Sequence, residues 1–319
     1  MDVINEEADT FAERVVWYPR FKKTYETLCH FLKFGGNDAE AMIIFGPVGA
    51  GKSFMLEQLE RDFPVTDTPN GTIRPVLSIR VAPENTLTGM LGNLLSAMGD
   101  PMPAGCSIVV RRLRLKKLIV AQCTRIVLID ESQSIMPRRG GDDKSEKIKL
   151  LRELTDDLKI PIVLTGKEDV KSILTADDAL RSRVRCAMSL EYFSCKSADE
   201  ALDFADYMDA LLGMFPRKLH GFTFIEETEN GGIVLSQNIN NLVRVMLATD
   251  GCPRSIKFLL KSVLTTTSPD TVVTTEHFES IFYMANNIDK SLLFNPFKAP
   301  FGKVKAEAEK RGLYDSDAF

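Results

Sequence analysis

Histidine is scarce in this sequence, and its scarcity narrows the chemistry that the chain can perform. Only three histidines occur among 319 residues, at His30, His220 and His277. None of them lies in a recognisable catalytic motif, whereas hydrolases of the Ser–His and Cys–His kinds need a histidine as general base. The sequence therefore gives no support for a hydrolase of either kind.

Long apolar runs are also missing. No stretch approaches the roughly 18 to 20 apolar residues that a helix needs to cross a bilayer. The N-terminal segment MDVINEEADT is acidic, whereas a signal peptide begins with basic residues. We therefore expect a cytoplasmic protein with no membrane partner.

Paired cysteines and a strong net charge are absent as well. The six cysteines form no CxxC pair, so neither a metal knuckle nor a disulfide framework is indicated. The formal net charge of −4 argues against a protein that coats nucleic acid by net charge alone, although it allows a local basic surface. The length allows a nucleotide-binding core plus a second module.

Five short apolar runs predict buried β-strands. They are AMIIF from Ala41, VLSIRVA from Val76, RIVLIDE from Arg125, IPIVLTG from Ile160 and MSLEYF from Met188. Helical patterns separate most of these runs, and this alternation predicts an α/β core, residues 41–195, with a parallel five-stranded sheet between two layers of helices.

The segments that flank this core have other patterns. Residues 1–40 carry a lead-in helix, since apolar residues recur at helical spacing behind the sequence VVWYPRF. Residues 196–288 show helical patterns only, which predicts a small all-helical second domain. Residues 289–319 mix Pro, Gly, Lys and isolated phenylalanines without a sustained period, and we interpret them as a tail.

A glycine-rich loop follows the first predicted strand. The run from Gly46 to Ser53 fits GxxxxGK[ST] and lies between a strand and a helical pattern, a setting that disfavours a mere glycine-rich turn. Its N–H groups can point at an anion, Lys52 supplies charge to the β- and γ-phosphates of ATP, and Ser53 offers a hydroxyl to Mg²⁺. The predicted nucleotide-binding residues are Gly46, Pro47, Val48, Gly49, Ala50, Gly51, Lys52, Ser53, Phe54, Asp130 and Arg254.

A pair of carboxylates ends the strand IVLID. Because Mg²⁺ and an attacking water both need carboxylates near the phosphate, Asp130 is predicted to hold the metal together with Ser53, and Glu131 to act as the general base. Thr165 ends a later strand and is predicted to read the γ-phosphate or to position water. In the alternative interpretation, the acidic pair only caps a strand. The two motifs together predict an ATPase.

Arginines can complete such a site, because a guanidinium stabilises the charge that develops on the γ-phosphate. Arg181, Arg183 and Arg185 precede the last predicted strand, where an arginine finger could reach the ATP of a neighbouring subunit. Arg254 begins a helical pattern of the second domain and could reach back to the nucleotide. Surface ion pairs are the alternative for each of them, and the choice among the first three stays open.

The motifs together resemble AAA+ ATPases of the TnsC/TniB kind, regulators that choose target DNA for bacterial transposons, including CRISPR-associated ones. The lead-in VVWYPRFKKTYETLCHFL, the stretch KIKLLRELTDDLKIPIVLTGKEDV, the sequence LLSAMGDP after Pro83, and Phe294-Asn295-Pro296-Phe297 carry this resemblance. Ser132-Gln133 after the acidic pair and the insert PRRGGDDKSEK depart from the family pattern.

The resemblance implies an AAA+ P-loop NTPase with a helical lid domain that oligomerises with ATP. The oligomer would be a ring or a helical filament on double-stranded DNA that recruits a transposase, works with target-selector proteins and disassembles on hydrolysis. Head-to-tail contacts that bring Arg183 to the ATP of the next subunit would generate such assemblies.

Two basic clusters are candidates for DNA contact. They are Arg111, Arg112, Arg114, Lys116 and Lys117 before the acidic pair, and Arg138 and Arg139, with Lys144, in the insert. A solvated helix face is the alternative for the first cluster.

The tail is a candidate docking site for the transposase or an adaptor. Phe294, Phe297 and Phe301 lie in an otherwise polar stretch, and exposed apolar side chains of this kind normally mark a docking site. The alternative is a tail that packs on its own helical domain.

Two other functions share the nucleotide-binding motifs. A replication initiator or clamp-loader-like ATPase usually carries an appended winged helix, and only about 30 residues follow the predicted helical domain here. A signalling switch with protein partners only would hydrolyse ATP slowly, and Glu131 argues against it.

Overall fold

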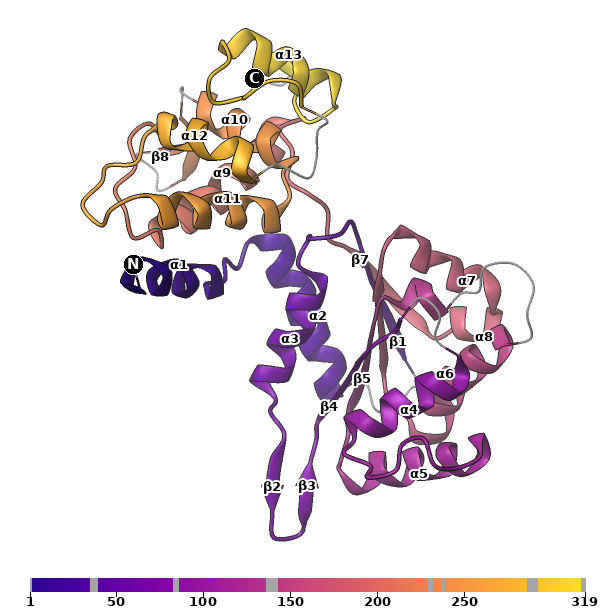
Figure 1. The fold of residues 1–319 in the computed structure, drawn as a ribbon. Helices are drawn as coiled ribbons and strands as arrows, with labels where there is room; N and C mark the ends of the chain where they lie inside the picture. The colour runs from indigo at the N-terminus through magenta and orange to yellow at the C-terminus, as the bar shows by residue number, and fades with distance from the viewer. Residues whose placement is uncertain are drawn as a thin grey trace. The chain divides into compact units, whose positions relative to one another are not determined.

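The computed structural model describes residues 2–34, 40–82, 86–135, 143–228, 232–236, 239–285 and 292–316 (Figure 1). The chain divides into two compact units. We call residues 20–191 the sheet unit, and residues 1–19 with residues 192–319 the helical unit. No helix among the described residues is both long and apolar enough to span a membrane.

A five-stranded parallel sheet forms the centre of the sheet unit, in the order β4-β5-β6-β1-β7. Its strands are β1 (Ala41–Phe45), β4 (Val76–Arg80), β5 (Ile126–Asp130), β6 (Ile162–Gly166) and β7 (Val184–Ser189). Every residue of β1, β5 and β6 is buried, as continuous apolar runs require. The predicted α/β fold with five parallel strands is confirmed.

The last strand begins earlier than the sequence pattern predicts. It pairs with β1 from Val184 onward, four residues before the expected start at Met188. The strand lies at an edge of the sheet, where partly buried and exposed residues mostly alternate. An edge strand of this kind has no continuous apolar run, which explains why the pattern located only its end.

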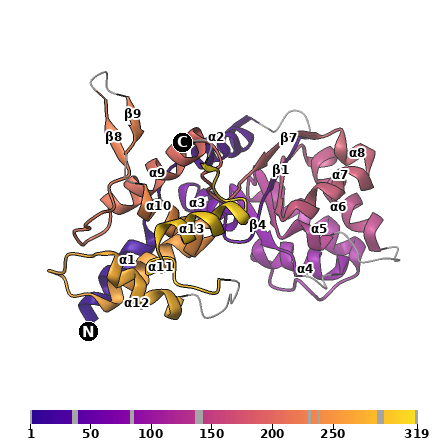
Figure 2. The same ribbon diagram turned by 90° about the horizontal axis from the view of Figure 1, so that it is seen from above.

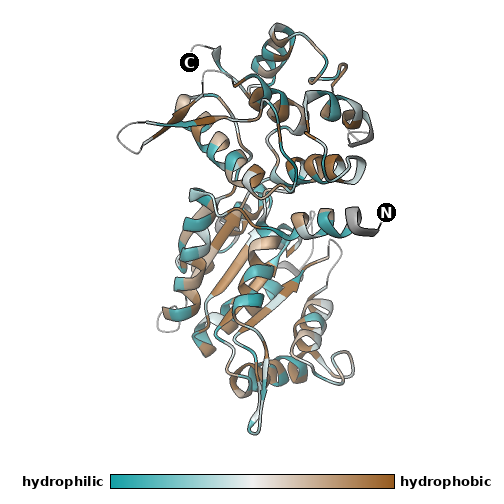
Figure 3. Cartoon of the chain, turned by 90° about the vertical axis from the view of Figure 1, so that its left-hand side faces the viewer, coloured by the Kyte–Doolittle hydropathy of each residue, from teal (hydrophilic) through white to brown (hydrophobic). Residues whose placement is uncertain are grey.

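Helices cover both faces of this sheet (Figure 1). Helices α2 (Pro19–Phe34) and α3 (Lys52–Asp62) lie on one face; α4 (Leu87–Ala97), α5 (Ile108–Ala121), α6 (Asp143–Leu158), α7 (Ser172–Ala176) and α8 (Asp178–Arg181) lie on the other. Figure 3 shows the strands as the apolar centre between them. A short hairpin, β2 (Thr66–Thr68) with β3 (Gly71–Ile73), joins α3 to β4 and was not predicted.

The helical unit contains six helices among its described residues. They are α1 (Asp2–Glu13), α9 (Ala198–Gly213), α10 (Asn240–Thr249), α11 (Pro253–Thr266), α12 (Thr275–Ala285) and α13 (Phe301–Lys310). The predicted helical second domain is therefore confirmed as a helical region. One correction applies, because it also contains the antiparallel hairpin of β8 (Ile225–Glu227) and β9 (Ile233–Leu235).

The first helix packs against this unit, although it comes from the other end of the chain. Phe11 is 1% exposed, and its ring meets Phe215 edge-on at 5.4 Å between centroids. Lys261 of α11 pairs with Asp9 at 2.6 Å, and Lys257 donates to the carbonyl oxygens of Ala12 and Arg14 near the end of α1. The single predicted lead-in helix is thus two helices, α1 and α2.

The C-terminal tail is also part of the helical unit. Phe297 is 5% exposed and packs against Phe278 and Phe282, because the tail folds back over α12. The expectation that Phe297 is an exposed docking residue is therefore wrong. Further along, Cys195 donates its N–H to the carbonyl oxygen of Leu313 at 2.7 Å, which ties the end of α13 to the segment that enters the unit.

Candidate nucleotide-binding site

The glycine-rich loop connects β1 to α3 by a path that only glycine can follow at two positions. Gly46 has φ 155°, and a Cβ there would lie 2.0 Å from the carbonyl oxygen of Leu190. Gly51 has φ 100° and precedes the first residue of α3, with the ring of Phe21 3.3 Å from the place of its Cβ. The loop therefore turns tightly into the N-terminus of a helix, the arrangement that binds phosphate.

Lys52 is the first residue of α3 and is buried, at 8% exposure. Its Nζ donates to the carbonyl oxygens of Gly46 and Pro47, each at 2.7 Å. The ammonium group therefore lies inside the curve of the loop. A phosphate there would give Lys52 charge-assisted hydrogen bonds, which are stronger than bonds to neutral carbonyls.

Three side chains from three different elements meet behind the loop. Ser53 Oγ donates to Asp130 Oδ2 at 2.7 Å, and Thr165 Oγ1 donates to Asp130 Oδ1 at 2.6 Å. Asp130 and Thr165 are both buried; Asp130 is the last residue of β5 and Thr165 the last but one of the neighbouring strand β6. Hydroxyl and carboxylate oxygens are the ligands that Mg²⁺ prefers, so Ser53 and Asp130 fit the predicted metal site.

Glu131 follows Asp130 in a left-handed backbone conformation, φ 55°, which is costly for a residue with a side chain and is typical of functional sites. Gln133 Nε2 donates to the Glu131 carboxylate, while Gln133 Oε1 accepts from Lys167 N at 3.2 Å. Arg80 Nη2 lies 3.4 Å from Glu131 Oε1. The carboxylate is therefore contacted by Arg80 at the end of β4 and by Gln133 after β5, and Lys167 after β6 holds Gln133 in place.

Arg80 and Gln133 were not among the predicted site residues. A signal for Arg80 was present, since it ends a predicted strand, and the carboxyl ends of parallel strands meet at one edge. In the sheet, Arg80 pairs in register with Asp130. Gln133 was noted only as a departure from a family pattern, and its role depends on a turn of 3₁₀-helix at Ser132–Ile135 that the sequence did not predict.

The three candidate finger arginines have different surroundings. Arg183 forms a two-pronged ion pair with Asp156, at 2.6 and 2.8 Å, and Arg185 lies 3.3 Å from Glu40. The side chain of Arg181 is 67% exposed, with Asp178 3.9 Å away. Of these three, Arg181 is the arginine most available to a neighbouring molecule.

Arg254 lies in the helical unit, in the first turn of α11 after Pro253. Its charge acts on Tyr192, whose pKa is raised mainly by burial and by a hydrogen bond with Cys252, and partly lowered by Arg254. The P-loop belongs to the sheet unit, so the contact of Arg254 with nucleotide stays a prediction.

The first predicted DNA-binding cluster faces its own unit. Arg111 is 7% exposed and donates to the carbonyl oxygens of Thr88, Ala104 and Cys106. Other cations of α5 pair with carboxylates: Arg112 with Glu146 and Glu153, Arg114 with Asp100, and Lys116 with Asp157. Most of this cluster is therefore paired within its own unit, because buried guanidinium groups need partners, whereas Lys117 is exposed; DNA contact by these residues stays a prediction. Arg138 and Arg139 lie outside the described residues.

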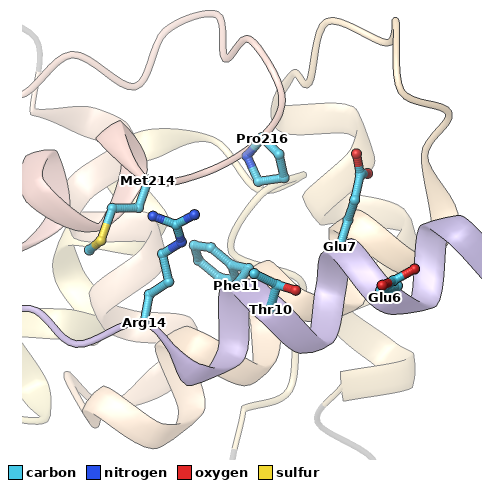
Figure 4. Close-up of a pocket in the computed structure, with 7 residues that line it drawn as sticks. All are labelled: Glu6, Glu7, Thr10, Phe11, Arg14, Met214 and Pro216. Atoms are coloured by element: carbon cyan, nitrogen blue, oxygen red, sulfur yellow. The ribbon is translucent and has the colours of Figure 1, made fainter.

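A cavity of about 310 Å³ lies in the helical unit between α1 and the segment after α9 (Figure 4). Its walls mix carboxylates and one guanidinium with apolar side chains. The lining residues are Glu6, Glu7, Thr10, Phe11, Arg14, Met214 and Pro216. None of them belongs to the predicted site.

The sheet order, the P-loop after β1 and the acidic pair after β5 define a P-loop NTPase of the AAA+ class. A family model described as bacterial TniB protein matches residues 8–192, more than half of the chain. The chain therefore belongs to the TniB family.

Solved structures share the fold at low sequence identity. The ORC2 protein of Aeropyrum pernix, in its ADPNP–ADP complexes, has TM-score 0.56 and 14% identity over 96% of this chain and 79% of that chain. A Walker-type ATPase of Pyrococcus abyssi has TM-score 0.53 and 15% identity over 92% and 75%. The ORC1 protein of Aeropyrum pernix in complex with DNA has TM-score 0.51 and 17% identity over 85% and 65%. No curated protein sequence is significantly similar to this chain.

Proposed function

We propose that this protein hydrolyses ATP with Mg²⁺ and uses the ATP cycle to assemble on double-stranded DNA as a regulator of transposition. The observation that carries the proposal is the Ser53–Asp130–Thr165 network behind the P-loop and beside Lys52. Membership of the TniB family supports a role in transposition.

Each residue of the site has a proposed task. The P-loop N–H groups and Lys52 bind the phosphates of ATP, and Ser53 and Asp130 hold Mg²⁺, which supplies charge to the phosphate oxygens. Glu131 accepts the proton of the attacking water. Gln133 and Arg80 orient the Glu131 carboxylate, and Thr165 orients Asp130 through its hydroxyl.

The assembly is proposed to form by head-to-tail contacts between copies of the chain. Arg181 would reach the γ-phosphate bound by the next copy, because it is the most exposed of the three candidates. Such contacts are heterologous and generate rings or open helices. DNA contact remains proposed for Arg138 and Arg139, and a DNA-bound relative in fold supports it. A transposase and target-selector proteins are the proposed partners.

Sedimentation with duplex DNA in ATP, a non-hydrolysable analogue or ADP tests this function. The wild-type chain should assemble on DNA with ATP and remain assembled with the analogue. Lys52→Ala should bind neither nucleotide nor DNA. Glu131→Gln should bind ATP, accumulate on DNA and lose about 10²–10⁴-fold in hydrolysis. A chain that hydrolyses ATP but stays monomeric with DNA in all three states would contradict the proposal and favour a switch that acts on proteins.

Complementation between subunits tests the finger. Arg181→Ala keeps the P-loop, and Lys52→Ala keeps the finger, so an equal mixture should recover part of the ATPase activity that each variant lacks alone. Arg181→Lys should not recover it, because a point charge does not reproduce the planar guanidinium. Full activity of Arg181→Ala alone would contradict the assignment.

A further inference from the structure

Arg181 lies on α8, a helix of only four residues. A helix this short is not stable by itself in water, since forming the first turn costs more than its few hydrogen bonds contribute. Leu180 anchors α8 in the core and is fully buried, whereas the side chain of Arg181 is 67% exposed. The direction in which Arg181 extends therefore depends on the contacts that hold the two ends of α8.

Helix α6 lies beside α8 (Figure 2) and contacts the chain at both ends of it. Before α8, Asp177 accepts the Leu180 N–H at 2.7 Å, and its other carboxylate oxygen lies 3.6 Å from Arg152 Nη1. After α8, Arg183 donates from Nε and Nη2 to the two oxygens of Asp156, at 2.6 and 2.8 Å. Arg152 and Asp156 are one helical turn apart, so they lie on the same face of α6. Helix α6 therefore holds α8 at both of its ends.

The contact after α8 is the stronger of the two. A two-pronged pair of guanidinium and carboxylate fixes the direction of both groups, whereas a single contact at 3.6 Å is too long for a hydrogen bond. The remaining nitrogen of Arg183, Nη1, donates to the carbonyl oxygen of Ala179 within α8. Asp156 lies in the last turn of α6, where the helix dipole disfavours a carboxylate. The stability of α6 therefore does not explain a carboxylate here, and the contact with Arg183 does.

We propose that Asp156 and Arg183 are positioning residues, which hold α8 so that Arg181 reaches the γ-phosphate bound by the next copy. This task rests on the head-to-tail contact of the proposed function. Each of the three nitrogens of Arg183 donates within its own unit, which leaves this guanidinium committed to α6 and α8. Arg181 has only Asp178 nearby, at 3.9 Å, so its guanidinium can turn toward a neighbouring copy.

The expected effect of losing the pair is smaller than that of losing the finger. An arginine finger contributes about 10³–10⁵-fold to the rate of phosphoryl transfer, and a displacement of about 1 Å in a positioned group can cost about 10²-fold. Without the Asp156–Arg183 pair, Arg181 is still present, but one end of α8 is released. We therefore expect kcat to fall about 10²-fold, with KM for ATP unchanged because the P-loop of the same copy is intact.

Asp156→Ala removes the pair without changing an arginine or the P-loop. Alanine favours the helical conformation, so α6 should keep its structure. Asp157→Ala is the matched control, because this neighbouring carboxylate of α6 pairs with Lys116 of α5 instead, and it should hydrolyse ATP like wild type. ATPase rates over a range of ATP concentrations, with duplex DNA present, give kcat and KM for both variants. Binding of a fluorescent ATP analogue and the melting temperature show that each variant is folded.

Mixing experiments separate a displaced finger from general damage to the fold. Asp156→Ala keeps its P-loop, so an equal mixture with Lys52→Ala, whose finger is intact, should recover part of the ATPase activity. A mixture with Arg181→Ala should recover none, because neither variant then offers a working finger. A misfolded variant would gain from neither partner. The double variant Asp156→Arg with Arg183→Asp re-forms the ion pair with reversed charges and should recover part of the lost kcat.

Three outcomes would overturn the inference. A wild-type kcat in Asp156→Ala would mean that the pair does not position Arg181, and if Arg183→Ala then loses activity, Arg183 itself contacts the phosphate. An equal loss in Asp157→Ala would mean that any carboxylate removed from α6 has this effect. Recovery of Asp156→Ala by Arg181→Ala would place the defect outside the finger. Failure of Arg181→Ala and Lys52→Ala to recover each other would instead contradict the proposed function, whatever the result with Asp156→Ala.

Discussion

The sheet unit and the helical unit are built from the chain in opposite ways. The sheet unit is one continuous segment, residues 20–191, whereas the helical unit combines residues 1–19 with residues 192–319. In the sheet unit, the parallel order brings the strand ends that carry Asp130 and Thr165 side by side, and Ser53 joins them from the start of α3. The helical unit depends on contacts such as that of Phe11 with Phe215, about two hundred residues apart in sequence. Local patterns therefore describe the first unit far better than the second.

Phe11→Ala should have the largest effect on the helical unit. Its ring is 1% exposed, and loss of a buried phenylalanine costs about 3–5 kcal/mol. We expect the helical unit to unfold at lower temperature while ATP still protects the sheet unit, which calorimetry with and without nucleotide would resolve. Phe34→Ala, on α2 and 67% exposed, is the control. One shared transition that shifts as a whole would show that the units unfold together.

Phe297→Ala tests whether the tail is a structural part of the helical unit. Its ring packs against Phe278, so we expect destabilisation near the lower end of the same range of about 3–5 kcal/mol. Leu293→Ala removes an apolar side chain that is 96% exposed and should leave the free energy of unfolding unchanged. Chemical denaturation measures both. Equal free energies of unfolding for the two variants would mean that the packing of Phe297 does not stabilise the helical unit, and would again favour a tail that is free to dock a partner.

Gly251→Ala should have a smaller effect, through the backbone. Gly251 has φ 67°, and a Cβ would lie 1.9 Å from the carbonyl oxygen of Phe193. Gly312 has φ 63° but nothing within 4 Å of that position. The conformation costs each alanine about 1–2 kcal/mol, and the close approach adds a further penalty only at Gly251. The difference in melting temperature between the two variants measures that penalty. Equal decreases in melting temperature would mean that the segment around Phe193 moves aside at no cost in stability.

The smallest expected effect concerns the reactivity of the Cys195 thiol, which is measured on the unchanged sequence. Burial, and then the charge of Glu200, raises the pKa of the Cys195 thiol to about 12. Since only the thiolate reacts with alkylating agents, native Cys195 should react very slowly at pH 8, faster as the pH rises toward 12, and readily after unfolding. The exposed Cys123 is the internal control. Mass spectrometry after timed labelling would measure both, and rapid labelling of Cys195 would show that the helical unit opens locally.

The sequence predicted those parts of the candidate site that a short local motif is enough to identify. The P-loop pattern and the IVLIDES strand identified Lys52, Ser53, Asp130 and Glu131, and the end of a later strand identified Thr165. The structure brings Ser53 and Thr165 onto the same carboxylate. Their catalytic roles stay predictions until the variants are measured. Gln133 could not be found in this way, because its position depends on the path of the chain after β5.

The basic stretch of α5 shows where sequence patterns fail. Five cations in one helix favour a nucleic-acid surface, yet Arg111 is buried and three others pair with carboxylates. The sequence does not state which side of a helix faces the core when charged and apolar residues are mixed. Acidic residues more than thirty positions away, Glu146 and Glu153 among them, decided it.

The sequence by itself determined the class of fold, since continuous apolar runs must be buried on both faces, and a glycine-rich loop between strand and helix binds phosphate. Tertiary structure alone decided that α1 belongs with the helical unit, that Phe297 is buried and that most cations of α5 pair within their own unit. The physical reason is the distance in sequence between the residues that contact each other. Strand burial and loop geometry depend on neighbouring residues, whereas the partner of a helix face or an arginine is set by segments that meet only after folding.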